Sequence, residues 1–267
     1  MSKHMDEGRL LCETCGYDLD GLDLESACPE CGRLVAESHA SHRKGSPWQK
    51  RPGLISWWHT NYSALRRPGE LFASIRLEPR TGRWLAWLNI TTAALIMVAP
   101  WTGTLIGDPI RTARGSGPLA ELLTFTWFFP AQIAAITAVL YTMTLIEYHA
   151  IRFIAARRGW RLTRAAAWQV CAHATVGWII LGIAPVFAMA AVYVMRVVLA
   201  WPLGRQLDLR VYGLGHTSIS TILSWLLPLI AIIAGVFVYE LLVYLGVRKC
   251  RYAAAVIVPP VPTRLLL

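Results

Sequence analysis

Four long stretches of the chain consist almost entirely of apolar residues. They lie at about 84–106, 122–147, 167–196 and 219–247. Each is at least as long as the roughly 20 residues that cross a hydrocarbon core of about 30 Å as a helix. Buried helices of soluble proteins rarely remain so free of charge over such lengths. The sequence therefore predicts an all-α transmembrane bundle of four spans within residues 84–250.

The third stretch, 167–196, admits two interpretations. Pro185 interrupts it, and the apolar run could extend to Leu203 with Arg196 inside it. Two short spans would place Arg196 near the middle of the second, where a charge costs about 2.5–3.5 kcal/mol on insertion scales. We therefore expect one long span that tilts or kinks, with Arg196 reaching toward the membrane interface.

Positive charge alternates between the segments that flank the expected spans. Segment 40–83 holds nine Lys and Arg, loop 107–121 has balanced charge, and loop 150–164 holds five Arg and no acid. Lys and Arg concentrate in cytoplasmic loops of membrane proteins. The alternation predicts a multi-pass protein of the cell (inner) membrane with its N- and C-termini in the cytoplasm.

Two segments outside the spans have the composition of connecting or mobile chain. Residues 40–53 are polar and punctuated by proline and glycine, so they are predicted to be a linker. Residues 251–267 are too short and too interrupted by proline to span a membrane, and we expect a flexible tail.

Residues 54–83 mix aromatic side chains with arginines. Pro68 suits the first position of a helix, and Leu71, Phe72 and Ile75 would fall on one face of it. This composition predicts an interfacial amphipathic segment that lies in the plane of the inner headgroups and contacts membrane lipids. The alternative is a cytosolic helix packed on the bundle.

Composition and charge agree with a membrane protein. Of 267 residues, 55% are hydrophobic and 16% are charged, whereas soluble domains are nearer a quarter charged. The net charge is +10, although residues 1–39 carry an excess of acid. Because the basic residues lie beside apolar runs, they favour membrane anchoring, and no nucleic-acid partner is expected.

Four of the six cysteines form two C-x-x-C pairs near the N-terminus: Cys12, Cys15, Cys28 and Cys31. Paired C-x-x-C units in a reducing compartment bind metal more often than they form disulfides. Two intervening residues let both sulfurs of one turn reach the same ion, and Gly16 and Gly32 permit the tight turns. We expect residues 1–39 to form a small β zinc ribbon that folds around one structural Zn²⁺. Iron, as in a rubredoxin-like centre, is the alternative metal.

Four ionisable residues fall inside or at the ends of the expected spans: Glu147, His149, His173 and Glu240. The expected topology places all four at a similar depth near the cytoplasmic leaflet. Intramembrane ionisable groups suggest a proton relay or a metal site. The alternative is that they bond to one another or extend into the headgroups, as expected for residues near the interface.

The cysteine segment, with Cys-x-x-Cys-Gly-Tyr-Asp-Leu followed by Cys-Pro-Glu-Cys-Gly, resembles the N-terminal zinc ribbons fused to bacterial membrane proteins. The lead-in from Arg67 to Phe72, before a compact bundle rich in small residues, resembles Yip-type membrane domains. That resemblance implies a membrane bundle. Yip-type domains usually have five spans where four are expected here, and the motifs typical of their eukaryotic, Rab-interacting members have no counterpart in this sequence, so no trafficking role is carried over.

No motif of a known catalyst occurs in the sequence, so we expect a protein that is not an enzyme. The sequence favours an integral membrane scaffold or adaptor whose cytosolic zinc ribbon binds a protein partner at the inner leaflet, through its acidic face. A small transporter or channel lined by the ionisable residues is the alternative. An intramembrane metalloenzyme built on the same residues is a third hypothesis. The oligomeric state does not follow from the sequence.

Overall fold

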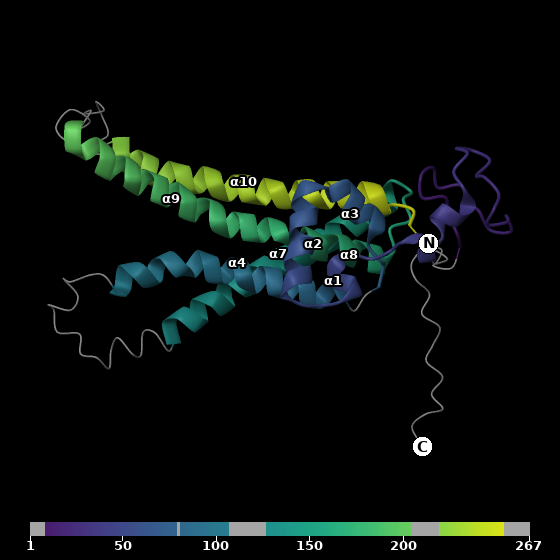
Figure 1. Ribbon diagram of the computed structural model, residues 1–267, viewed down its shortest axis with the longest axis horizontal. Coiled ribbons are helices and arrows are strands. Elements are labelled where there is room, and N and C mark those ends of the chain that lie inside the picture. Colours follow the sequence, from purple (N-terminus) through teal and green to yellow (C-terminus); the bar gives the residue numbers. More distant parts are fainter. Residues whose placement is uncertain (1–8, 79–80, 107–126, 204–218, 254–267) are drawn as a thin grey trace, which may run out of the picture. The chain divides into compact units, whose positions relative to one another are not determined.

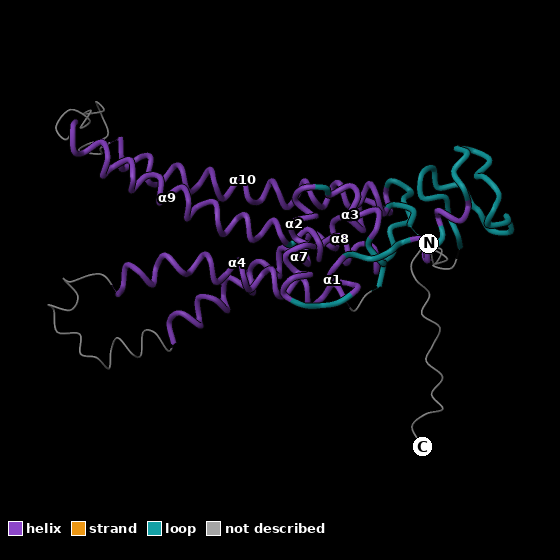
Figure 2. The backbone as a smooth tube through the Cα atoms, viewed as in Figure 1, coloured by secondary structure: helices purple, strands orange, loops and turns teal. Residues whose placement is uncertain are grey.

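The chain is largely helical. The computed structural model describes residues 9–78, 81–106, 127–203 and 219–253, which form helices joined by turns and loops, with no β-strand among them (Figure 2). Four helical segments are long and apolar enough to cross a membrane: Thr81–Pro100, Phe129–Arg157, Arg164–Ala191 and Leu226–Cys250. The prediction of four helices long and apolar enough to cross a membrane is confirmed.

The long helices are α4 (Thr81–Ile106), α7 (Phe129–Arg157), α8 (Arg164–Ala174), α9 (Val176–Leu203) and α10 (Ile219–Cys250) (Figure 1). The short elements are the 3-10 turns η1 (Val35–Ser38) and η2 (Ala40–His42) and the helices α1 (Pro47–Lys50), α2 (Leu54–Arg66) and α3 (Pro68–Ser74). The expected start of the second span at residue 122, the loop 107–121 and the tail beyond residue 253 lie outside the described residues.

The chain divides into two compact units. The first comprises residues 1–87, 143–174 and 241–267, and the second comprises residues 88–142 and 175–240. The first unit therefore combines the cysteine segment, the short helices and α8 with one end each of α4, α7 and α10. The described residues of the second unit belong mainly to α9 and to parts of α4, α7 and α10.

Helix α7 continues ten residues past its expected end at residue 147, to Arg157. The arginines beyond that point do not end the helix, because they fold back onto aromatic rings. Arg157, for example, lies 4.6 Å from the centre of the Phe153 ring. The helix ends at Gly159, which has φ +69°. There the N–H of Trp160 donates to the carbonyl of Ala155 and that of Gly159 to Ala156, which is a Schellman cap.

The third span is one apolar segment interrupted at Thr175, between α8 and α9. The expectation of a single long span with a kink agrees with this break. It falls at Thr175 rather than at Pro185, which lies inside α9. At the break the N–H of Trp178 donates to the carbonyl of Thr175 at 3.0 Å, a tightened turn that opens the next helix.

Residues 40–53 differ from the expected linker because they fold into the first unit. Ser46 caps α1 with a reciprocal capping box, in which its side chain accepts from the N–H of Gln49 and its N–H donates to the Gln49 side chain. The Gln49 amide also donates to the carbonyl of Arg76 at 2.7 Å and to Gln169 at 3.2 Å. Polar residues occur here because they satisfy buried backbone groups.

Helix α2 packs against α1, α3 and α8 with its polar side. Thr60, Asn61 and Ala64 are buried, whereas an apolar face is exposed. The exposed residues are Leu54, Ile55, Trp58, Tyr62 and Leu65, and the first three are 78%, 77% and 63% exposed. Their spacing places them on one side of the helix. This orientation is opposite to that of a helix on a water-soluble surface.

Helix α3 begins at Pro68, as the sequence predicts, and its apolar face is buried. Leu71 and Phe72 are buried within it, and Ile75 is buried directly after it. A side chain at Gly246 of α10 would meet the Phe72 ring and Val170 of α8. The absence of a side chain at Gly246 therefore lets three elements of the first unit meet closely.

In the second unit, α9 and α10 lie side by side (Figure 1). A Cβ at Gly235 of α10 would lie 2.4 Å from the Cα of Leu181, and one at Gly177 of α9 would lie 2.6 Å from the Cα of Tyr239. Each helix thus supplies a glycine where the other comes closest. Small residues allow this backbone approach where lipid removes the hydrophobic drive between helices.

Candidate metal centre

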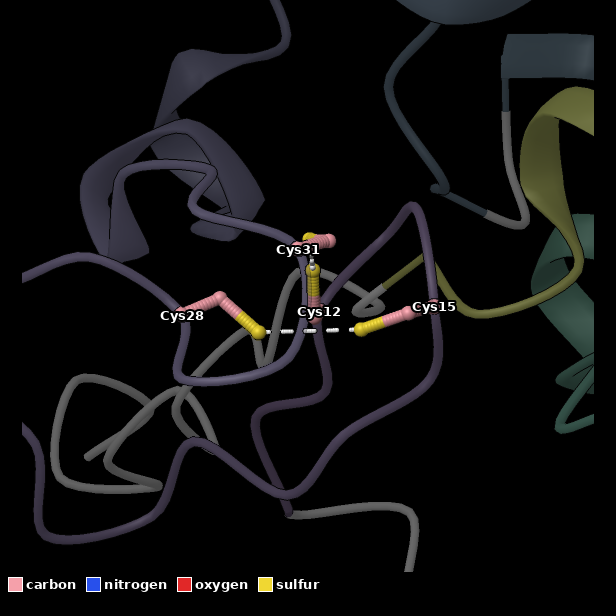
Figure 3. A group of neighbouring side chains, drawn as sticks. All are labelled: Cys12, Cys15, Cys28 and Cys31. Carbon is pink, nitrogen blue, oxygen red and sulfur yellow. Dashed lines mark hydrogen bonds between the residues drawn. The ribbon is translucent and has the colours of Figure 1, made fainter.

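The four cysteines of the N-terminal segment converge on one point. Their sulfur atoms all lie within 4.8 Å of one another, with 3.4 Å between Cys12 and Cys31 and 3.6 Å between Cys15 and Cys28 (Figure 3). All four thiols are free, and these separations are much longer than a disulfide bond. They form the one group of three or more His, Cys, Asp or Glu in the described residues that could hold a metal ion.

The two C-x-x-C turns have the same backbone hydrogen bonds. The N–H of Gly16 donates to the carbonyl of Cys12 at 2.8 Å, and that of Gly32 donates to Cys28 at 2.9 Å. Both glycines have positive φ, +82° and +73°, a region that disfavours side chains. The role that the sequence assigned to these glycines is confirmed.

Each turn is closed by an isolated antiparallel bridge, Leu11 with Asp18 and Ala27 with Leu34. The expected β ribbon is therefore present in the described residues only as two single bridges, without a paired strand. The core beneath the sulfurs is correspondingly small and consists of Cys12, Leu19, Cys28 and Val35. So small a core gives little stability by itself, and an ion held by the four cysteines would add to it.

The spacing of the sulfurs fits a tetrahedral ion. Zinc–sulfur bonds of about 2.3 Å place the sulfurs of a tetrahedron about 3.8 Å apart, close to the observed separations. The first cysteine of each pair is buried and the second is exposed, so the cluster lies at the surface of its own small core. Four thiolates occupy all four positions of such an ion, and none remains for a substrate.

When no cation is bound, the ionisation of one thiol affects the ionisation of its neighbours. Burial raises the pKa of the Cys12 thiol, but backbone N–H groups at Cys15 and Thr14 and the neighbouring thiols lower it by more, to about 6. Burial and the neighbouring thiols raise the pKa of Cys15 to about 12. A divalent cation would remove this conflict, because it stabilises several thiolates together.

Arg33 connects the two turns. Its guanidinium donates to the Thr14 hydroxyl at 3.1 Å and to Glu37 at 3.0 Å, and lies 3.9 Å from Glu13. Glu13 and Thr14 are the two residues between Cys12 and Cys15. The two residues between the cysteines of the first turn thus contact Arg33, which follows the second turn.

The first cysteine turn is also attached to the helical part of its unit through Arg43, which is buried. Arg43 pairs with Glu13 at 2.8 Å and donates to the carbonyls of Phe72 and Ile75 at 3.1 and 3.2 Å, and to that of Lys249 at 3.3 Å. Burial lowers the pKa of Arg43, but the neighbouring Cys250 and Glu13 raise it overall. The guanidinium therefore remains charged and joins three segments.

Two residues after α10 complete this attachment. Arg251 donates to the carbonyl of Thr14 at 3.1 Å, and the ring of Tyr252 lies where a side chain at Gly16 would be. Residues 251–253 are therefore part of the first unit, although we expected the flexible tail to begin at residue 251. The contact with Gly16 gives this glycine a second reason to lack a side chain.

His173 is buried in the first unit, and both of its ring nitrogens have partners. Nδ1 lies 2.8 Å from the carbonyl oxygen of Gln169, and Nε2 lies 3.0 Å from the Ser46 hydroxyl. Since a carbonyl can only accept, Nδ1 carries the hydrogen and Nε2 accepts from Ser46. His173 thus joins α8 to the start of α1, which is a structural role.

The other predicted ionisable residues occupy separate places. Glu147 and His149 lie on α7 in the first unit, half-buried and exposed respectively, whereas Glu240 lies on α10 in the second unit and is exposed. His149 packs edge-on against the ring of Tyr148 at 4.9 Å. In the described residues none of the four belongs to a group that could hold a metal ion.

Protein-family models, curated proteins and solved structures were each compared with the chain, and none of them matches it.

Sequence reasoning found the four cysteines and missed Arg43, Arg251 and Tyr252, which hold the cysteine segment in place. The sequence held one indication that Arg43 lies in a folded segment. The polar residues around it include Ser46, which begins a capping box. Nothing in the sequence relates Arg43 to Lys249 or Thr14 to Arg251, because these pairs are more than 200 residues apart.

Proposed function

We propose that the chain is an integral membrane scaffold or adaptor, whose zinc-bound cysteine segment lies in the cytoplasm and binds a protein partner at the inner leaflet. Zinc is preferred over iron because the closed tetrahedral thiolate set suits a structural role. When bound, the ion would neutralise the four thiolates and hold the two turns together. The resemblance to Yip-type domains remains a prediction.

The observation that carries this proposal is an exposed apolar and acidic loop between the two cysteine turns. Leu22 and Leu24 are 37% and 53% exposed, and Asp23 and Glu25 beside them are also exposed. The first turn is occupied by Arg43 and Arg251, whereas this loop is not used in that attachment. Exposed leucines flanked by carboxylates suit a partner segment with basic and apolar side chains.

The exposed face of α2 supports a position at the leaflet. Leu54, Ile55 and Trp58 project from a helix whose polar residues are buried, and arginines stand at both of its ends. Apolar and aromatic side chains with nearby arginines are typical of helices that lie in the headgroup region. A nitroxide label at Ile55 should be accessible to oxygen and shielded from a water-soluble nickel complex, whereas a label at Arg66 should not. Equal accessibility at both positions would contradict this placement.

Site-specific photo-crosslinking in cells tests the adaptor function. A photoreactive residue at Leu24 should give a discrete protein adduct, and one at the exposed Ala156 at the end of α7 should not. Reversing the loop charge with Asp23→Lys/Glu25→Lys should remove the adduct while the zinc content remains that of the wild type. The proposal fails if Leu24 gives no adduct, or if Leu24 and Ala156 give the same ones.

The transporter alternative lacks a comparable observation. It requires a hydrated path lined by Glu147, His173 and Glu240. Both nitrogens of His173 are engaged by Gln169 and Ser46, and Glu240 belongs to a different unit from the other two. No observation in the described residues favours this alternative over the adaptor.

A further inference from the structure

The first unit contains a cavity of about 730 Å³, between the cysteine segment, α3 and the last turn of α10. This volume lies within the range of small-molecule sites in proteins. The cavity is lined mainly by polar and charged residues, and Leu245 is the largest aliphatic side chain among them. Such a lining suits a polar ligand.

The carboxylates of the lining are each already neutralised. Glu13 pairs with Arg43 at 2.8 Å and Glu37 with Arg33 at 3.0 Å. The third, Glu70, lies 3.6 Å from Arg67.

Four further cations line the cavity: Lys44, Arg248, Lys249 and Arg251. Among the described residues, no carboxylate forms an ion pair with any of these four. Cations gathered around one cavity repel one another, and an anion would relieve that repulsion.

Arg251 adds a hydrogen-bond donor that lacks a partner. Its terminal nitrogen is held by the carbonyl of Thr14 at 3.1 Å, and its guanidinium lies 5.1 Å from the centre of the Tyr252 ring. Its Nε is buried and has no hydrogen-bond partner among the described residues. A buried donor without a partner costs free energy, and Arg251 is one of the residues that line the cavity.

We propose that this cavity binds a phosphate group, carried either by a membrane lipid headgroup or by a soluble phosphate. Arginine and lysine side chains are the usual phosphate ligands, since they combine charge with several donors. The cavity adjoins the last turn of a helix that is long and apolar enough to cross a membrane, which suits a headgroup. This site is separate from the loop of Leu22 and Leu24 and does not depend on it.

Binding to the full chain in nanodiscs tests the site, with two probes. Inorganic phosphate is titrated calorimetrically into phosphatidylcholine nanodiscs. In parallel, nanodiscs that also contain phosphatidic acid are analysed for lipid retained by the protein. Lys44→Gln/Arg248→Gln removes two exposed cations of the lining and should weaken binding by about tenfold or more. Arg157→Gln/Arg158→Gln at the end of α7, outside the cavity, is the matched control and should leave binding unchanged.

Either probe can support the site, and the pair identifies the source of the phosphate. Saturable binding of inorganic phosphate that Lys44→Gln/Arg248→Gln weakens indicates a soluble ligand. Selective retention of phosphatidic acid over phosphatidylcholine, lost in the same variant, indicates a headgroup. Binding of neither probe, or an equal loss in the Arg157→Gln/Arg158→Gln control, overturns the proposal. Wild-type zinc content and elution volume establish that the variants are folded. Arg251→Gln, which removes the buried Nε donor, provides an independent second variant.

Discussion

The first unit keeps its short segments in place through buried polar side chains, whereas the second unit brings long helices together through glycines. In the first, Arg43, Gln49 and His173 each bond to backbone or side-chain groups of other segments. In the second, Gly177 and Gly235 have no side chains, so the backbones of α9 and α10 approach closely at these two positions. The difference shows that one chain can pack short, irregular segments in one way and long helices in another.

Each kind of packing suits the backbone that it holds. Loops and short helices leave many N–H and C=O groups without partners, and buried polar side chains satisfy them. Long helices satisfy their own backbone, so their association depends on shape and on small residues. Substitutions in the two units should therefore act by different mechanisms and to different extents.

The largest effect is expected from the metal site of the first unit. Cys12→Ser/Cys15→Ser should reduce the zinc content from one ion per chain to none, and the small core of the cysteine segment should unfold with it. Metal analysis and limited proteolysis between residues 18 and 25 measure both changes. Cys171→Ala removes a buried thiol outside the cluster and should retain the ion. A protease-resistant segment without metal would contradict the assignment.

The next effect concerns the buried cation of the first unit. Arg43→Met removes the closer of the two arginines that face Glu13 and three hydrogen bonds to backbone carbonyls, so the free energy of unfolding should fall by about 3–5 kcal/mol. Hydrogen exchange should increase at residues 70–75 and around Lys249. Arg66→Met, at an exposed end of α2, should change the stability by less than about 1 kcal/mol. A small effect of Arg43→Met would show that polar bonds do not hold this unit.

A smaller loss is expected from overpacking in the second unit. Gly235→Ala would place a Cβ 2.4 Å from the Cα of Leu181, and backbone atoms cannot move aside cheaply. The stability of the α9–α10 pair should fall by about 1–3 kcal/mol despite the better helix propensity of alanine. Ala234→Leu, on the neighbouring exposed position, is the control and should be tolerated. Equal stability of the Gly235→Ala and Ala234→Leu variants in a denaturant titration would argue against close backbone contact.

The smallest effect tests whether hydrogen bonds also matter in the second unit. The Asn89 amide of α4 donates to the Thr175 hydroxyl at 3.0 Å. Interhelical hydrogen bonds inside membranes contribute about 0.6 kcal/mol on average, so Asn89→Leu should cost little. A double-mutant cycle with Thr175→Val isolates the pair. A coupling energy as large as that of Arg43 with Glu13 would show that polar bonds stabilise the second unit as much as the first.

The elements that the sequence predicts correctly are those with local causes. Long uncharged stretches specify helices in lipid, Pro68 specifies the start of α3, and the Cys-x-x-Cys-Gly spacing specifies the sulfur cluster. In each of these cases the residues that decide the structure lie close to the element they define.

The remaining features depend on contacts between distant residues. Residues 40–53 have the composition of a linker because their polar side chains satisfy buried carbonyls of other segments, which a local pattern does not reveal. For the same reason the sequence did not reveal that His173 bonds to Ser46, which lies 127 residues earlier.

The position of Arg43 also sets the order in which the protein can mature during synthesis. Its partner Glu13 leaves the ribosome early, but its contact with Cys250 joins residues 207 apart in the sequence. Until α10 has been synthesised and inserted, the carbonyl of Lys249 is not present to accept from the Arg43 guanidinium. The cysteine segment could therefore bind a metal ion early in synthesis, whereas its contacts with residues 249–252 form only near the end of translation. A chain interrupted before residue 249 would expose this unsatisfied arginine, a difference that cellular quality control could recognise.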